Sequence, residues 1–137
     1  MRFVLDNSVC MAWFFSDEAN DYTISILDAL TTHTCLVPSL WSLEVANVLL
    51  MGQRRRRCNE AECSRFIALL TALPIATDHR TAEQALHDIY RLAQQYRLTS
   101  YDAAYLELAI REGLPLATQD KALRQAAQQS GVQLFNS

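Results

Sequence analysis

Short apolar runs, each followed by a segment with helical spacing, constrain this chain more than any other feature. Residues 3–5 and 35–37 are apolar throughout, and residues 116–118 end on a threonine. A strand with one solvated face alternates apolar and polar residues, so these runs are expected to be strands that are covered on both faces. Strands of this kind, separated by helices, form a parallel sheet. The sequence therefore predicts an α/β fold.

Capping residues and glycines set the expected limits of the other elements. Gly113 and Gly131 follow two helical segments, and Thr81 with Gln84 matches a capping box. We expect a short strand or extended link at 73–76 and a last strand at 132–135. Helices are expected from residue 7 onward and over residues 17–30, 40–53, 59–71, 81–96, 100–111 and 121–129.

The length and charge of the chain bound its organisation. A chain of 137 residues predicts one domain over residues 1–137. The longest apolar run, residues 9–15, is too short to span a membrane, so we expect a soluble, cytoplasmic protein with no membrane partner. The formal net charge of −3 argues against a basic coat of the kind that binds nucleic acid.

The cysteines give no indication of a metal site. Cys10, Cys35, Cys58 and Cys63 are scattered, and no close pair has histidines nearby to complete a zinc site. Cys58 and Cys63 are five residues apart, a spacing that makes side chains diverge on a helix. We therefore expect reduced, buried thiols.

Acidic residues recur where a parallel sheet binds its ligands. In such sheets this place lies outside the carboxyl ends of the strands. Four carboxylates at this edge would repel one another at neutral pH, so either they are partly protonated or a divalent cation lies among them. Hard oxygen ligands select Mg²⁺ or Mn²⁺. The acids at the expected strand ends and helix starts are Asp6, Glu44, Asp102 and Asp120.

Helical spacing indicates which way two of these acids point. At about 100° per residue, Glu44 falls on the same face as Leu43 and other apolar residues. Asp102 likewise falls on an apolar face, whereas Glu107 and Arg111 fall on the opposite, solvated face. An acid on a buried face is uncommon unless it is paired or coordinates a metal.

Three of the acids also have purely structural explanations. Asp6 would fit an Asx turn, Asp102 would complete a capping box with Thr99, and Asp120 would serve as the N-cap of the last helix. Glu44 has no comparable explanation because it lies inside its helix. These readings remain open for each acid taken singly.

Four segments in chain order resemble the PIN-domain family, specifically its VapC-type toxin ribonucleases: residues 4–9, 37–47, 98–106 and 116–121. The resemblance implies a PIN-like three-layer α/β/α fold with a short parallel central sheet. It also implies a Mg²⁺- or Mn²⁺-dependent endoribonuclease, the toxin of a type II toxin–antitoxin pair, which hydrolyses RNA phosphodiester bonds by metal-activated water. Expected partners are RNA, a cognate antitoxin and a second copy of the chain.

The resemblance assigns roles to particular residues. It maps Asp6, Glu44, Asp102 and Asp120 onto the acidic metal-binding and catalytic set. Ser8 and Thr118 map onto polar positions that line the site, and we expect them to contact the substrate. Asn7 departs from the small residue usual at its position, which puts only local substrate contacts in doubt.

A run of four arginines is the one strongly basic feature. The run is either a solvated turn at the negative end of a helix or a patch that contacts RNA phosphates. Leaving out the four site acids changes the formal charge from −3 to +1, so the acidity of the chain is concentrated in the expected site. The run comprises Arg54, Arg55, Arg56 and Arg57.

Two further functions are compatible with parts of the sequence. The first is a catalytically weak or inert module of the same fold that binds an antitoxin or RNA. The second, a phosphatase with Asp6 as nucleophile, is less favoured because Ser8 stands where such enzymes place a second aspartate. The chain has no P-loop motif, which excludes nucleotide hydrolysis of that type.

Overall fold

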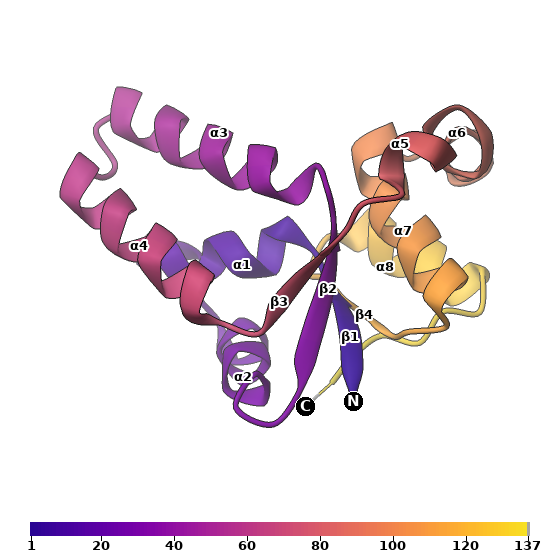
Figure 1. Cartoon of the computed structure of the whole chain (residues 1–137), viewed down its shortest axis with the longest axis horizontal. Coiled ribbons are helices and arrows are strands. Elements are labelled where there is room, and N and C mark those ends of the chain that lie inside the picture. Colours follow the sequence, from indigo (N-terminus) through magenta and orange to yellow (C-terminus); the bar gives the residue numbers. More distant parts are fainter. Residues whose placement is uncertain (137) are drawn as a thin grey trace.

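A computed structural model describes residues 1–136 of the chain. Within these residues a sheet of four parallel strands has the order β3-β2-β1-β4 (Figure 1). The apolar runs that predicted buried strands lie in three of the strands, and the segment expected at 73–76 continues into the fourth. The strands are β1 (Arg2–Leu5), β2 (Thr34–Pro38), β3 (Ile75–Asp78) and β4 (Leu116–Ala117).

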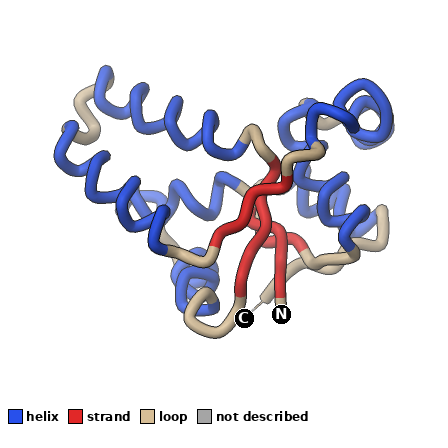
Figure 2. The backbone as a smooth tube through the Cα atoms, viewed as in Figure 1, coloured by secondary structure: helices blue, strands red, loops and turns tan. Residues whose placement is uncertain are grey.

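Helices cover both faces of this sheet, as Figure 2 shows in blue on either side of the red strands. Helices α1 to α4 lie on one side and α5 to α8 on the other (Figure 1), which confirms the predicted three-layer α/β/α arrangement. No helix in residues 1–136 has the length and apolarity needed to cross a membrane. The helical elements are α1 (Asn7–Phe14), η1 (Ser16–Glu18), α2 (Asp21–Ala29), α3 (Trp41–Arg54), α4 (Glu60–Ala72), α5 (Thr81–Gln84), η2 (Ala85–Ile89), α6 (Tyr90–Tyr96), α7 (Ser100–Glu112) and α8 (Lys121–Gln129).

The core is centred on β1, which lies between β2 and β4. Phe3 is fully buried, and its ring stacks on Phe135 with 4.1 Å between centroids. The C-terminal segment therefore packs on the sheet, but the strand expected at 132–135 is wrong. Leu134 makes a single bridge with Leu116, since β4 is only two residues long and offers little edge to pair with.

One predicted helix start and one predicted helix cap are also wrong, each because of a side-chain hydrogen bond. The acids at 17 and 18 lie in the 3₁₀ turn η1, and α2 begins only after Asn20. Asn20 and Thr23 form a reciprocal capping box that fixes this start. Thr81 begins α5 but does not cap it, since its hydroxyl accepts from the Ser39 backbone N–H at 3.2 Å.

Helix α3 packs by a different stripe from the one expected. Trp41, Val45 and Leu49 are buried against the rest of the fold. Leu43 is 75% exposed, so the prediction that it lies on the buried apolar face of this helix is wrong. Glu44 lies at the edge of the buried stripe and is half-buried.

Helix α7 has no broad solvated face. It contacts η2, α6, α8 and three strands of the sheet, and residues 103–109 are all buried. Glu107 is only 4% exposed and forms an ion pair with Arg111. The expectation that these two residues face solvent is therefore wrong, because neighbouring elements cover α7 on more than one side.

Candidate functional site

The site lies where the order of strands reverses. The chain passes from β1 to β2 to β3 in one direction across the sheet and then returns to place β4 on the other side of β1. Ligands of open α/β sheets bind at such a switch point, beyond the carboxyl ends of the strands. Asp6 follows β1 directly, and its backbone N–H donates to the Ala117 carbonyl at 2.9 Å. This bond brings the ends of β1 and β4 together.

Asp6 is the most buried of the four acids, with 4% of its surface exposed. Two hydroxyls, Ser8 Oγ and Thr118 Oγ1, each donate to its Oδ2 atom at 2.7 Å. Burial raises the pKa of Asp6 above its usual value, while these two hydrogen bonds oppose the rise and the charge of Asp120 adds to it. Thr118 is itself fully buried, so its hydroxyl holds Asp6 and does not reach a substrate, contrary to the expectation for this residue.

Asp120 has a structural role as well as a place in the site. Its Oδ2 atom accepts from the Leu123 backbone N–H at 2.9 Å and so caps α8, which confirms the N-cap reading. Its own backbone N–H donates to Thr118 Oγ1 at 3.1 Å. Thr118 thereby links Asp120 to Asp6.

Asp102 lies in the first turn of α7 and is half-buried. Thr99 caps this helix by accepting from the Asp102 backbone N–H at 3.1 Å, which is one half of the predicted capping box. Burial raises the pKa of Asp102 to about 6, and the charges of Asp6 and Asp120 contribute to the rise. The Asp102 carboxylate therefore interacts electrostatically with both acids at the switch point.

Glu44 joins the group from the first turn of α3. Burial raises its pKa, the hydrogen bond from Tyr105 lowers it, and the charges of Asp6 and Asp102 raise it further. The Tyr105 hydroxyl donates to Glu44 Oε1 at 2.5 Å from a fully buried ring on α7. The helical spacing of Tyr105 gives no indication that its hydroxyl orients an acid on another helix.

The charges of neighbouring acids contribute to the raised pKa values of Asp6, Glu44 and Asp102. A divalent cation would relieve this repulsion. Within residues 1–136, no three His, Cys, Asp or Glu side chains are grouped closely enough to enclose one metal ion by themselves. The donor set still fits Mg²⁺ or Mn²⁺, because hard cations take carboxylate oxygens and Mg²⁺ usually keeps several waters.

The four arginines at 54–57, called the basic turn below, are not part of the acid site. They end α3, and Arg54 lies about 15 Å along the helix axis from Glu44. All four are exposed. Arg57 pairs with Asp17 and Glu18, at 3.0 and 3.3 Å, and its guanidinium lies over the Phe15 ring.

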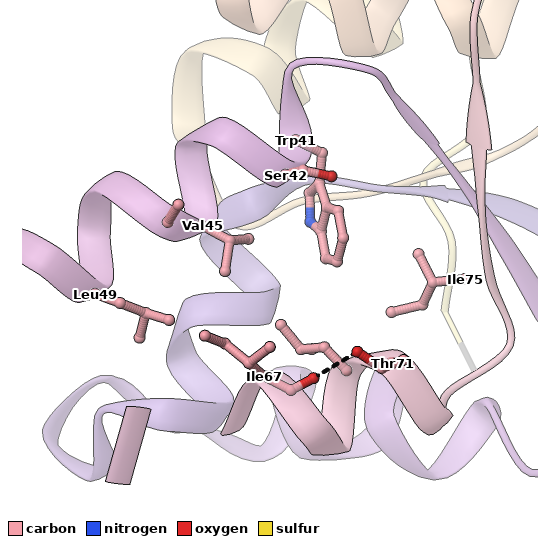
Figure 3. Close-up of a pocket in the computed structure, with 9 residues that line it drawn as sticks. Trp41, Ser42, Val45, Leu49, Ile67, Thr71 and Ile75 are labelled. Carbon is pink, nitrogen blue, oxygen red and sulfur yellow. Dashed lines mark hydrogen bonds between the residues drawn. The ribbon is translucent and has the colours of Figure 1, made fainter. Parts of the chain in front are cut away.

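An apolar hollow of about 420 Å³ lies between α3 and α4 (Figure 3). Trp41, Ile67 and Ile75 project into it from α3, α4 and β3. The indole Nε1 of Trp41 has no hydrogen-bond partner among the described residues. None of the four acids lines this hollow, so it is separate from the acid site.

The fold and the site define an α/β protein with an acidic centre at the switch point of a parallel sheet. Residues 3–129 match the family model described as PIN domain, and the chain belongs to the PIN-domain family. This confirms the family predicted from the four sequence segments.

A curated relative and three solved structures agree with this assignment. Ribonuclease VapC3 from Pyrobaculum aerophilum is 32% identical over 124 residues, which cover 90% of this chain and 92% of that protein. The structure of VapBC2 from Rickettsia felis, solved with a promoter DNA fragment, matches with a TM-score of 0.69 at 13% sequence identity. The match covers 99% of this chain and 98% of that chain.

Two further structures share the fold. PAE2754 from Pyrobaculum aerophilum has a TM-score of 0.68 at 23% identity and covers 92% of this chain and 84% of its own. FitAcB from Neisseria gonorrhoeae has a TM-score of 0.62 at 19% identity, and the match covers 99% of this chain and 97% of that chain. At these identities the structural matches support the fold alone.

Proposed function

We propose that this protein is a Mg²⁺- or Mn²⁺-dependent endoribonuclease and the toxin of a type II toxin–antitoxin pair. The observation that carries the proposal is the meeting of four acids at the switch point of the sheet, where burial and mutual repulsion raise the pKa of Asp6, Glu44 and Asp102. The 32% identity with a protein named Ribonuclease VapC3 supports RNA as the substrate.

In this proposal Asp6, Asp102 and Asp120 hold the cation, directly or through water, and Glu44 completes the acidic set. The bound cation would supply Lewis-acid charge that stabilises the phosphodiester transition state and acidifies water. Ser8 and Thr118 hold Asp6 in place by hydrogen bonds to one of its oxygens, which leaves the other oxygen for a ligand.

Glu44 is the proposed general base. A base works best when its pKa is near the working pH, and burial and the neighbouring acids raise the Glu44 pKa in that direction. The Tyr105 hydroxyl fixes one oxygen of Glu44, so the other accepts the proton of the attacking water. The water oxygen bonds to phosphorus as the bond to the 3′ oxygen breaks, giving a 5′-phosphate and a 3′-hydroxyl.

We also propose that the basic turn contacts RNA phosphates away from the scissile bond. The basic turn lies about 15 Å from Glu44 along α3, which places it away from the scissile phosphate. Arg54, Arg55 and Arg56 are exposed and accessible to RNA, whereas Arg57 is paired with Asp17 and Glu18. Replacing all four arginines by alanine should weaken RNA binding and flatten its salt dependence. An unchanged salt slope would identify the run as a solvated turn.

Cleavage of a structured RNA tests the catalytic proposal. Activity should require Mg²⁺ or Mn²⁺, stop with EDTA, and fall by about 100-fold or more in Asp6→Asn, in line with the loss of a central charged group. Asp28→Asn is the matched control, since Asp28 is an exposed acid on α2. Activity that survives EDTA or Asp6→Asn would contradict the proposal. Calorimetric titration with Mn²⁺ distinguishes the nuclease from an inert binding module of the same fold. The nuclease should bind the metal saturably, whereas the inert module should not.

The partners follow from the same proposal. A cognate antitoxin would occlude the acids, and an antitoxin arginine is a suitable group because a guanidinium pairs with carboxylates in a bidentate manner. We also propose a homodimer in the cytoplasm, where the RNA substrate is found. In this proposal a partner protein covers exposed apolar side chains such as Leu43 on α3 and Leu86 on η2. Light scattering of the purified chain, alone and with the product of a neighbouring reading frame, tests both partners.

A further inference from the structure

Two thiols meet beside the basic turn, although their spacing predicted that they would diverge. Cys58 Sγ and Cys63 Sγ are 3.6 Å apart. The prediction failed because Cys58 is not in the helix: α4 begins at Glu60, and Asn59 is its N-cap. Cys58 and Cys63 thus occupy the N′ and N4 positions, whose side chains pack together as a hydrophobic staple.

The local structure holds this pair in place. Asn59 and Glu62 form a reciprocal capping box, with hydrogen bonds of 2.9 and 3.0 Å, which fixes the backbone between the two cysteines. Gly52 makes room for the first thiol, because a Cβ atom there would lie 2.9 Å from Cys58 Sγ. Cys63 is buried and Cys58 is partly buried, so Cys58 is the thiol that a small reagent in solvent reaches first.

The thiol pair lies among charges of both signs. Arg55, Arg56 and Arg57 directly precede Cys58, and all three are exposed. Arg57 is paired with Asp17 and Glu18, and the exposed acids Glu60 and Glu62 follow Cys58 closely in the chain. The approach of a small reagent to Cys58 therefore requires no particular charge on that reagent.

We propose that Cys58 and Cys63 form a dithiol modification site, which a low-molecular-weight disulfide such as oxidised glutathione converts to an intramolecular disulfide. The Cys58 thiolate attacks one sulfur of the small disulfide and releases one small thiol. Cys63 then attacks the Cys58 sulfur and releases the second small thiol. The protein loses two hydrogen atoms and the small disulfide is reduced to two thiols.

The resulting bond would clamp the start of α4 to the end of the basic turn. A crosslink that closes a loop of this length restricts the unfolded chain and should raise the melting temperature by about 5 °C. The site lies at the opposite end of α3 from Glu44 and uses none of the proposed catalytic residues. Its test is therefore independent of RNA cleavage.

The experiment treats the reduced, full-length protein with oxidised glutathione at pH 8.5, since burial, Cys63 and Glu62 raise the pKa of Cys58. We expect the intact mass to fall by two hydrogens. Trypsin should release residues 58–65 with both cysteines, and cleavage after Glu60 or Glu62 should leave the two halves joined.

Variants of the cysteines give the controls. Cys63→Ala should stop at a mixed disulfide on Cys58, and Cys58→Ser should not react. The double variant Cys10→Ser with Cys35→Ser should still close the bond, because those two thiols are buried elsewhere in the core. Phenylarsine oxide, which needs two adjacent thiols, should bind the reduced protein and neither single variant.

Three results would overturn the inference. The first is an unchanged intact mass after oxidation together with no binding of phenylarsine oxide. The second is a disulfide between two molecules or between other cysteines. The third is an oxidised protein whose melting temperature is no higher than that of the reduced protein, which would refute the stabilisation of α4 by the disulfide.

Discussion

Replacing Arg111 by methionine should destabilise the protein far more than a surface charge does. The Arg111 guanidinium donates to both carboxylate oxygens of Glu107, at 2.8 and 3.1 Å, and to both of Asp78, at 3.1 and 2.9 Å. These bonds join α7 to the end of β3. Methionine keeps much of the apolar stem of the side chain and removes the charge.

The magnitude follows from burial. The side chains of Arg111, Glu107 and Asp78 are 15%, 5% and 11% exposed, so removing the cation leaves two carboxylates with little water. Breaking a buried ion pair by removing one partner costs about 3–5 kcal/mol. A solvated pair at the same i,i+4 spacing contributes only about 0.3–0.5 kcal/mol. The expected loss is a large part of the 5–15 kcal/mol typical of a whole domain.

The pH dependence gives the prediction a second signature. The hydrogen bonds from Arg111 lower the pKa of Asp78, so in the wild type this acid contributes stability above its unfolded pKa and loses it as the pH falls. Without Arg111, the hydrogen bonds that lower the pKa of Asp78 are lost and burial raises this pKa instead. Protonation then favours the folded variant, and the gap between the two proteins narrows as the pH is lowered toward 4.

Urea unfolding followed by circular dichroism, at pH 7.5 and 4.5, measures this difference. Arg91→Met is the matched control, because Arg91 pairs with Asp88 at 2.7 Å but both side chains are exposed. The control should lose less than about 0.5 kcal/mol. If Arg111→Met also lost less than about 0.5 kcal/mol of unfolding free energy, with no dependence on pH, the reasoning would be refuted. Arg111 would then behave as the solvated side chain that helical spacing predicted.

Three further predictions concern the acid site and one helix end. Without divalent metal, Asp102→Asn should stabilise the protein by about 1–2 kcal/mol at pH 7.5, because the half-buried Asp102 is ionised there despite its raised pKa of about 6. Urea unfolding at a series of pH values should show that this gain in stability disappears near pH 4. Thr118→Val removes the hydroxyl that donates to buried Asp6 at 2.7 Å, so calorimetry should show a loss of about 1.5–3 kcal/mol at pH 7.5 and a smaller one in acid. Gly113 ends α7 at a φ of 64° with open space around it, so Gly113→Ala should cost about 1 kcal/mol in urea from backbone strain alone, and a neutral result would contradict that reading.

Local chemistry in the sequence was enough to predict much of the fold. Residues 3–5 and 35–37 are apolar on both faces, which only a covered parallel sheet accommodates, and they form β1 and β2. Gly113 adopts the left-handed conformation expected of a helix C-cap. The four acids could be placed at one sheet edge because the carboxyl ends of parallel strands and the helices that follow them meet there. These features depend on neighbours in the chain or on a general rule of topology.

Packing between distant elements decided the rest. Helical spacing predicts the direction in which a side chain points from the helix axis, but not which other elements pack on that side of the helix. Glu107 and Arg111 were therefore predicted to face solvent, although neighbouring elements cover α7 on several sides. Spacing likewise could not show that Tyr105 holds Glu44 from another helix, or that Thr118 is too buried to reach a substrate. The sequence by itself determined which residues carry the charge of the site. The tertiary structure decided which of them are desolvated, which hydroxyls hold them, and therefore how their pKa values shift.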